Sequence, residues 1–231
     1  MTRNIKALGL ALIAVFAMSA WIASAAQAAP TVTLKDTNGA TVGTADFTGE
    51  ETEGKHKFTV DGSSVECANV AFSGTITDGE TWTTVTPSYT ECTAFGFLGA
   101  TVSTAGCDYK LMANAENAAD TYSGEIEVFC NTGNAITITA GGVCEAKVNS
   151  GTVINTGTTA TNITGLSHEH LKLHNVNSEV KTEKTKDGFG CPFNGTGTVN
   201  NATYNGHTTV KAYVDGSAHN AANQVNITLM P

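Results

Sequence analysis

Three histidines are concentrated in one short segment, which reads His168-Glu169-His170-Leu171-Lys172-Leu173-His174. On an extended strand alternate side chains share a face, so His168, His170 and His174 would lie on the same side. Neutral imidazoles spaced in this way suit Zn²⁺ or Cu²⁺. We therefore treat these three histidines as candidate metal ligands. A neighbouring strand would have to supply a further ligand, for which the available side chains are His207, His56 and Glu179.

The same segment has a simpler interpretation. Lys172 falls in the row of the histidines, and a lysine ammonium beside a divalent cation is unfavourable. Leu171 and Leu173 occupy the opposite face, as they would on an amphipathic strand with one side in the core. The histidines would then line the solvated face of that strand, and no cofactor is expected.

Carboxylates offer a second kind of chemistry. Acidic residues gather at Asp46, Glu50, Glu51 and Glu53, where oxygen ligands could hold Ca²⁺, but the spacing is not that of an EF-hand loop. An acidic surface loop is the simpler interpretation of the cluster, and it is the one we favour. Two carboxylates could also hydrolyse a glycosidic bond, yet no pair stands out. The hydrolase motifs G-x-S-x-G and H-E-x-x-H do not occur.

Aromatic residues are a third group. Trp82, Tyr89, Phe95 and Phe97 could together line a platform for a carbohydrate. Aromatic side chains of this spacing are more often part of a hydrophobic core.

The elements that would position these groups are strands. Apolar and polar residues alternate in many segments, such as 210–214 and 225–229, which indicates half-buried strands. Asn38-Gly39 predicts a two-residue hairpin between 31–37 and 40–47. No segment of 12 residues after residue 28 has helical periodicity. The sequence thus predicts an all-β fold, most simply an antiparallel β-sandwich, elongated or two-lobed.

Six cysteines follow residue 28, and an even number in an exported chain indicates three disulfides. Six cysteines permit 15 pairings. One pair follows from a hairpin register. If Cys107 lies opposite Cys130, then Tyr109 meets Val128 and Leu111 meets Ile126 on one apolar face. Lys110 then meets Glu127 on the other face, and 114–119 is left as the loop. By neighbourhood in the sequence, the remaining bridges would be Cys67–Cys92 and Cys144–Cys191.

These cysteine segments resemble a known group of proteins. The stretches 89–96 (YTECTAFG), 106–109 (GCDY) and 126–130 (IEVFC) are similar to those of small exported proteins of high-GC Gram-positive bacteria. The resemblance implies export, β structure and disulfides. That group has no assigned activity, so no site residues carry over from it.

The N-terminus carries the features of a secretory signal over residues 1–28. Arg3 and Lys6 precede an apolar run, and Ala26-Gln27-Ala28 is a small-x-small cleavage site. The alternative is an uncleaved membrane anchor. Cleavage would change the net charge from −9 to −11, which argues against nucleic acid as a partner. Residues 29–231 would form a single β-rich domain, with a possible lobe boundary near 114–120.

Together these patterns favour an exported, non-enzymatic structural or binding module of the cell envelope or extracellular space, whose partner and ligand the sequence does not identify. The alternatives are a secreted hydrolase that uses surface carboxylates and a metal-binding protein that uses the His168/His170 strand. After cleavage, no membrane span would remain.

The signal interpretation gives the first testable prediction. Exported protein should begin at Ala29, because the small residues Ala26 and Ala28 fit the specificity of signal peptidases. N-terminal sequencing of the exported protein checks this. A chain that still began at Met1 would favour the membrane anchor instead.

Overall fold

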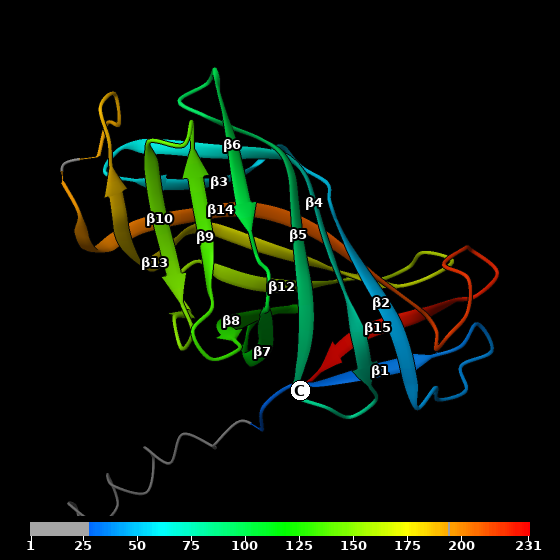
Figure 1. Ribbon diagram of the computed structural model, residues 1–231. Helices are drawn as coiled ribbons and strands as arrows, with labels where there is room; N and C mark the ends of the chain where they lie inside the picture. The colour runs from blue at the N-terminus through cyan, green and yellow to red at the C-terminus, as the bar shows by residue number, and fades with distance from the viewer. Residues whose placement is uncertain (1–27, 194) are drawn as a thin grey trace, which may run out of the picture.

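The computed structural model describes residues 28–193 and 195–231, so the expected signal segment lies almost wholly outside the described residues. These residues form antiparallel β-strands, with no helix among them (Figure 1). Within them, accordingly, no helix is long and apolar enough to cross a bilayer. The strands are β1 (Thr31–Lys35), β2 (Thr44–Glu51), β3 (His56–Val60), β4 (Ser63–Thr77), β5 (Trp82–Ala94), β6 (Leu98–Ser103), β7 (Cys107–Ala118), β8 (Thr121–Cys130), β9 (Ala135–Ala140), β10 (Cys144–Asn149), β11 (Val153–Ile154), β12 (Thr158–Ile163), β13 (His170–Asp187), β14 (Gly197–Val214) and β15 (Gln224–Met230).

Alternation of side chains explains why these segments are strands. In β9, Ile136, Ile138 and Ala140 are buried, while the residues between them are partly exposed. In β15, Val225, Ile227 and Leu229 are buried in the same way. The predicted all-β, antiparallel class is therefore confirmed. The strands belong to one 15-stranded sheet rather than to two separate stacked sheets.

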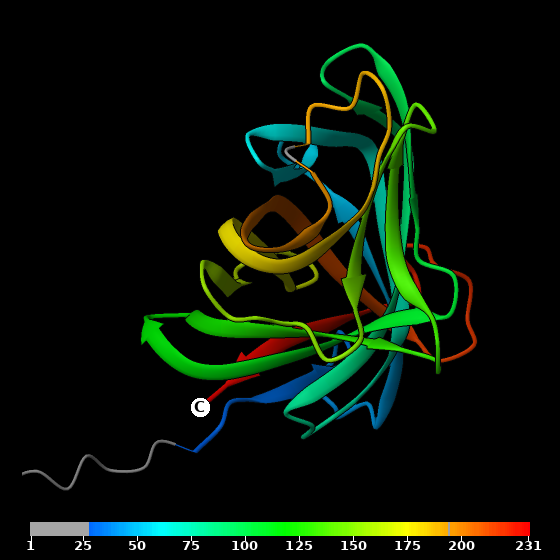
Figure 2. The ribbon, with the colours of Figure 1, turned by 60° about the vertical axis from the view of Figure 1, so that its left-hand side comes forward.

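The strand pairings close this sheet on itself twice. We call the first closure the lower ring, and it consists of β2, β4, β5, β7, β8, β12, β13 and β14 in order. The second, which we call the upper ring, consists of β3, β4, β5, β6, β9, β10, β13 and β14. Figures 1 and 2 show the strands wrapping around a common interior.

Four long strands, β4, β5, β13 and β14, run through both rings and exchange partners halfway. Strand β4 pairs with β2 through residues 71–77 and with β3 through residues 63–67. We call the level of this exchange the waist. Because the shared strands form two distant pairs in the sequence, β4–β5 and β13–β14, neither ring is one continuous segment of the chain.

Each ring has its own hydrophobic core. The lower core contains Phe47, Val85 and Tyr122, and the upper core contains Val128, Ile138 and Val180. The ribbon of β1 and β15 lies at one end of the lower ring (Figure 1) and adds Leu34 and Ile227, which are fully buried. Polar contacts fix the ribbon there: the Tyr122 hydroxyl and the Asn162 amide both donate to the Leu229 carbonyl, at 3.0 and 2.9 Å.

The three disulfides all belong to the upper core, and none of the described cysteines is free. They join Cys67 to Cys92, Cys107 to Cys130, and Cys144 to Cys191, which are the pairs expected from the sequence. The β7–β8 register also places Tyr109 opposite Val128 and Lys110 opposite Glu127, as predicted. The Lys110 ammonium lies over the ring of Trp82, 4.9 Å from its centroid.

The loop predicted at 114–119 was wrong, because β7 continues to Ala118 and the turn falls at residues 119–120. The segment lacks an apolar stripe, but pairing with β8 requires only backbone groups. Two bulges, after Ala113 and after Glu116, absorb the irregular spacing.

The hairpin predicted at Asn38-Gly39 was wrong in its pairing. A turn is present, with Gly39 at φ 84° and the Asp36 carboxylate accepting from the backbone of Asn38 and Ala40. However, β1 pairs with β15, and β2 pairs with β4 and β14. The two arms of the turn are joined over a short distance, by an antiparallel bridge between Lys35 and Thr41 and by backbone hydrogen bonds from Asp36 to Ala40 and from Val42 to Leu34.

We predict that replacing both Cys107 and Cys130 by Ala lowers the free energy of unfolding by about 2–4 kcal/mol, because the bridge restricts the unfolded chain. The strand content at low temperature should stay unchanged, since the β7–β8 pairing does not depend on the bridge. Urea denaturation and far-UV circular dichroism measure the two quantities. Loss of β structure at low temperature in the variant would show instead that the bridge is required to form the hairpin.

Candidate ligand-binding site

The histidine segment does not converge on one point. His170 and His174 lie on β13 with Lys172 between them, and a four-residue separation on a strand is about 13 Å. His168 precedes the strand. Among residues 28–193 and 195–231, no group of three His, Cys, Asp or Glu side chains is placed to hold a metal ion together.

The other sequence candidates are also dispersed. The Asp46 carboxylate accepts from the backbone of Gly216, whereas the Glu53 carboxylate pairs with Lys172 at 2.7 Å. Trp82 is the first residue of β5, and Phe97 lies in the turn that follows β5. Both side chains are exposed, whereas Tyr89 lies against the upper core. These aromatic residues therefore form no common platform.

Glu50 and Glu51 line a polar groove of about 460 Å³ beside β4 and β5. Burial raises the pKa of the Glu51 carboxyl, and its Oε2 has no hydrogen-bond partner in the described part of the chain. The two carboxylates are neighbours on one strand. They do not face each other across a cleft, which is the arrangement that two-carboxylate glycoside hydrolysis uses.

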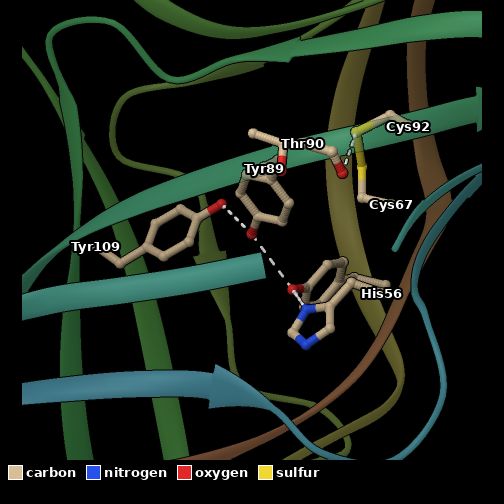
Figure 3. The surroundings of a disulfide bond; sticks show 7 residues. His56, Cys67, Tyr89, Thr90, Cys92 and Tyr109 are labelled. Atoms are coloured by element: carbon tan, nitrogen blue, oxygen red, sulfur yellow. Dashed lines mark hydrogen bonds between the residues drawn. A yellow bond between two sulfur atoms is a disulfide. The ribbon is translucent and has the colours of Figure 1, made fainter. Parts of the chain in front are cut away.

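The most organised polar group is a chain of hydrogen bonds inside the waist, formed by Tyr109, Tyr89, Tyr204 and His56 (Figure 3). The hydroxyls of Tyr109 and Tyr89 are 3.0 Å apart, and those of Tyr89 and Tyr204 are 3.3 Å apart. The Tyr204 hydroxyl contacts His56 Nδ1, and His56 Nε2 lies 3.3 Å from the carbonyl oxygen of His207. We call these four residues the tyrosine–histidine chain.

The last contact sets the direction of the chain. A carbonyl only accepts, so His56 carries its proton on Nε2 and its Nδ1 accepts from Tyr204. Tyr204 must then accept from Tyr89, and Tyr89 from Tyr109. The oxygen of Tyr109 is left as the end of the chain that can accept a further hydrogen bond.

The electrostatics keep every member neutral. Burial lowers the pKa of His56 to about 4, and the contact with the His207 carbonyl only partly opposes this. Burial also raises the pKa of Tyr89, Tyr109 and Tyr204 well above the ordinary value for tyrosine. Near neutral pH the chain therefore offers hydrogen bonds but no charge.

The four residues come from four different strands, β3, β5, β7 and β14, and close packing holds them. The ring of Phe72 lies edge-on to Tyr89, with centroids 6.3 Å apart. Gly206 allows the imidazole of His56 to lie directly on β14, since a Cβ at that position would come within 2.5 Å of His56 Nδ1. A side chain at residue 206 would therefore displace the histidine.

The chain borders a cavity of about 50 Å³ in the upper ring. All four members line it, together with Cys67 of the Cys67–Cys92 disulfide, which Figure 3 shows beside the tyrosines. The rest of the wall is almost entirely apolar and includes Val102, Ile126, Val128, Ile136, Ile138, Val148, Ile154 and Val180. The site thus combines an apolar wall with one hydrogen-bonding end.

Sequence reasoning missed this site. His56 and Tyr204 are 148 residues apart, and no local pattern in either segment indicates that the two side chains form a hydrogen bond. The only available signal was the position of Tyr109 on the apolar face of the predicted hairpin, which requires a buried partner for its hydroxyl.

No protein-family model, no curated protein and no solved structure matches this chain.

The pKa of His56 predicts how stability depends on pH. In the unfolded chain the imidazole titrates near 6.5, whereas in the folded protein its pKa is about 4. Below pH 6.5 the unfolded state binds the extra proton, so stability is present above this pH and is lost as the pH falls toward 4. Between about pH 7.5 and pH 4.5, His56 should account for a loss of about 2–3 kcal/mol.

Urea denaturation at the two pH values, for the wild type and for His56→Gln, isolates this contribution from that of the carboxylates. The variant should lose correspondingly less stability on acidification. His219→Gln, at a partly exposed histidine stacked on Tyr213, is the matched control and should behave as wild type. Equal pH slopes in wild type and His56→Gln would contradict the neutral, buried assignment.

Proposed function

We propose that this protein is an exported, non-enzymatic binding module that holds a small, uncharged organic molecule in the cavity of the upper ring. The observation that supports this is the cavity itself, whose apolar wall ends at the tyrosine–histidine chain. Pockets that combine a largely apolar lining with a few converging polar groups are typical of small-molecule sites.

The chemistry of the wall favours a neutral ligand. The histidine and tyrosine pKa shifts leave no ionised group in the chain near neutral pH. A charged ligand would lose its hydration without gaining a partner of opposite charge, which is costly. A ligand hydroxyl, by contrast, can donate to the oxygen of Tyr109.

The size of the cavity limits the ligand. By the same measure one water molecule needs about 10–15 Å³, so the cavity of about 50 Å³ has room for the equivalent of a few waters. A small alcohol is of the right order. A phenol would require the wall to move, because an apolar cavity that binds benzene measures about 150 Å³.

The disulfides bear on where the protein works. Three bridges indicate an oxidising compartment such as the extracellular space. Export through the signal at residues 1–28, and residence at the cell surface or beyond it, are part of the proposal. A role as a component of the cell envelope would be compatible with the same fold.

Phenol, benzene and benzoate test the proposed ligand class in calorimetric or NMR titrations. Phenol should bind with a Kd of about millimolar or tighter, and benzene should bind about two- to tenfold more weakly because it lacks the hydroxyl. Benzoate should not bind, because its charge would be desolvated without a partner. In Tyr109→Phe the preference for phenol over benzene should disappear.

Val102→Phe, which fills the cavity, should abolish binding of both neutral ligands. Val153→Phe, at a largely exposed position on β11, is the matched control and should leave binding intact. If the folded Val102→Phe variant bound phenol as well as the wild type does, the ligand would lie elsewhere and the proposal would fail.

A further inference from the structure

The outer wall of the waist carries a pair of histidines from adjacent strands. His174 on β13 lies directly opposite His207 on β14, and their Nδ1 atoms are 2.8 Å apart. The two rings are nearly perpendicular, with centroids 4.8 Å apart. One imidazole therefore donates its Nδ1 proton to the other, and this contact brings two potential metal ligands together.

The separation of two nitrogens that bind one metal ion depends on the angle between the two metal–nitrogen bonds. With metal–nitrogen bonds of about 2.0–2.1 Å, two ligands at 90° are about 2.9 Å apart, whereas two ligands at the tetrahedral angle are about 3.3 Å apart. The 2.8 Å between His174 Nδ1 and His207 Nδ1 is a hydrogen-bond distance, and a metal ion bound by both nitrogens at about 90° would need only a small change in it. Square-planar coordination by imidazole nitrogen is the preference of Cu²⁺.

We propose that His174 and His207 form a surface site for Cu²⁺, in which the two Nδ1 atoms are adjacent ligands and replace the proton that they share. Since no third His, Cys, Asp or Glu side chain converges here among the described residues, water completes the coordination. This site is separate from the cavity, and the inference does not rest on the proposed ligand.

The charges around the pair favour a cation more than the sequence suggested. Lys172 lies on the same face as His174, but its ammonium is paired with the carboxylate of Glu53 at 2.7 Å. Glu53 therefore offsets the repulsion that Lys172 would exert on a metal ion.

The pair also differs from the segment that first suggested a metal. His168 and His170 precede His174 in the sequence but lie away from it, whereas His207 comes from the neighbouring strand. The structure thus retains His174 from the predicted segment and pairs it with His207, one of the three side chains named as a possible further ligand.

Titration of the oxidised protein with Cu²⁺, followed by calorimetry and by electron paramagnetic resonance, tests the proposal. One Cu²⁺ should bind with a Kd of about micromolar. The spectrum should show a tetragonal Cu²⁺ with two equatorial imidazole nitrogens. Zn²⁺ should bind at least about tenfold more weakly, since nitrogen ligands generally bind Cu²⁺ more tightly than Zn²⁺.

His174→Ala and His207→Ala should each weaken Cu²⁺ binding by at least tenfold, with near-UV circular dichroism confirming that each variant is folded. The control is the double variant His168→Ala/His170→Ala, which should bind as wild type does. Lys172→Gln should bind Cu²⁺ at least as tightly as wild type. Binding that survives in both single variants, or that is lost in the control, would overturn the proposal, as would a spectrum without two imidazole nitrogens.

Discussion

The constraint on which this structure depends is that four strands must pair with the correct neighbours in two rings at once. Each of β4, β5, β13 and β14 pairs along most of its length, first with the neighbours of one ring and then with those of the other. A slip of one residue in such a strand would turn its buried side chains outward in both rings. Closure also leaves the strands of the two rings without open edges, and only β1 and β11 among the described strands stand at the ends of the sheet. One continuous register therefore determines both cores.

The tyrosine–histidine chain lies at the level where the long strands exchange partners. Strand β2 ends at Glu51 and β3 begins at His56, so β4 and β14 change neighbours at this level. Bulges interrupt the β13–β14 pairing nearby, after Asn175 and after Val180. The tyrosine–histidine chain lies in the interior at this level, and each of its hydroxyls has a hydrogen-bond partner.

Local patterns predicted the strands because burial alternates along them, and the β7–β8 register because four side-chain pairings share it. The turn at Asn38-Gly39 shows the limit of such patterns. The residues of the turn fix its geometry, but Leu34 in β1 gains more by packing with Ile227 in the lower core than a hairpin with β2 would offer. The tyrosine–histidine chain lay beyond sequence reasoning for the same reason. Its members meet only after both rings have closed.

The two proposed sites lie on opposite faces of one strand, and the two-residue period of that strand keeps them chemically separate. Tyr204, Gly206 and Thr208 of β14 face His56 or contact it, whereas the imidazole of His207 meets His174 on the outer wall. His207 nevertheless contributes to both sites, because its backbone carbonyl accepts the hydrogen bond from His56. A change of the His207 side chain removes an outer ligand but leaves that carbonyl in place. The carbonyl also fixes the tautomer of His56, and with it the direction of the whole chain. The interior site therefore depends on the course of the β14 backbone, and the exterior site depends on the identity of the side chains that it carries.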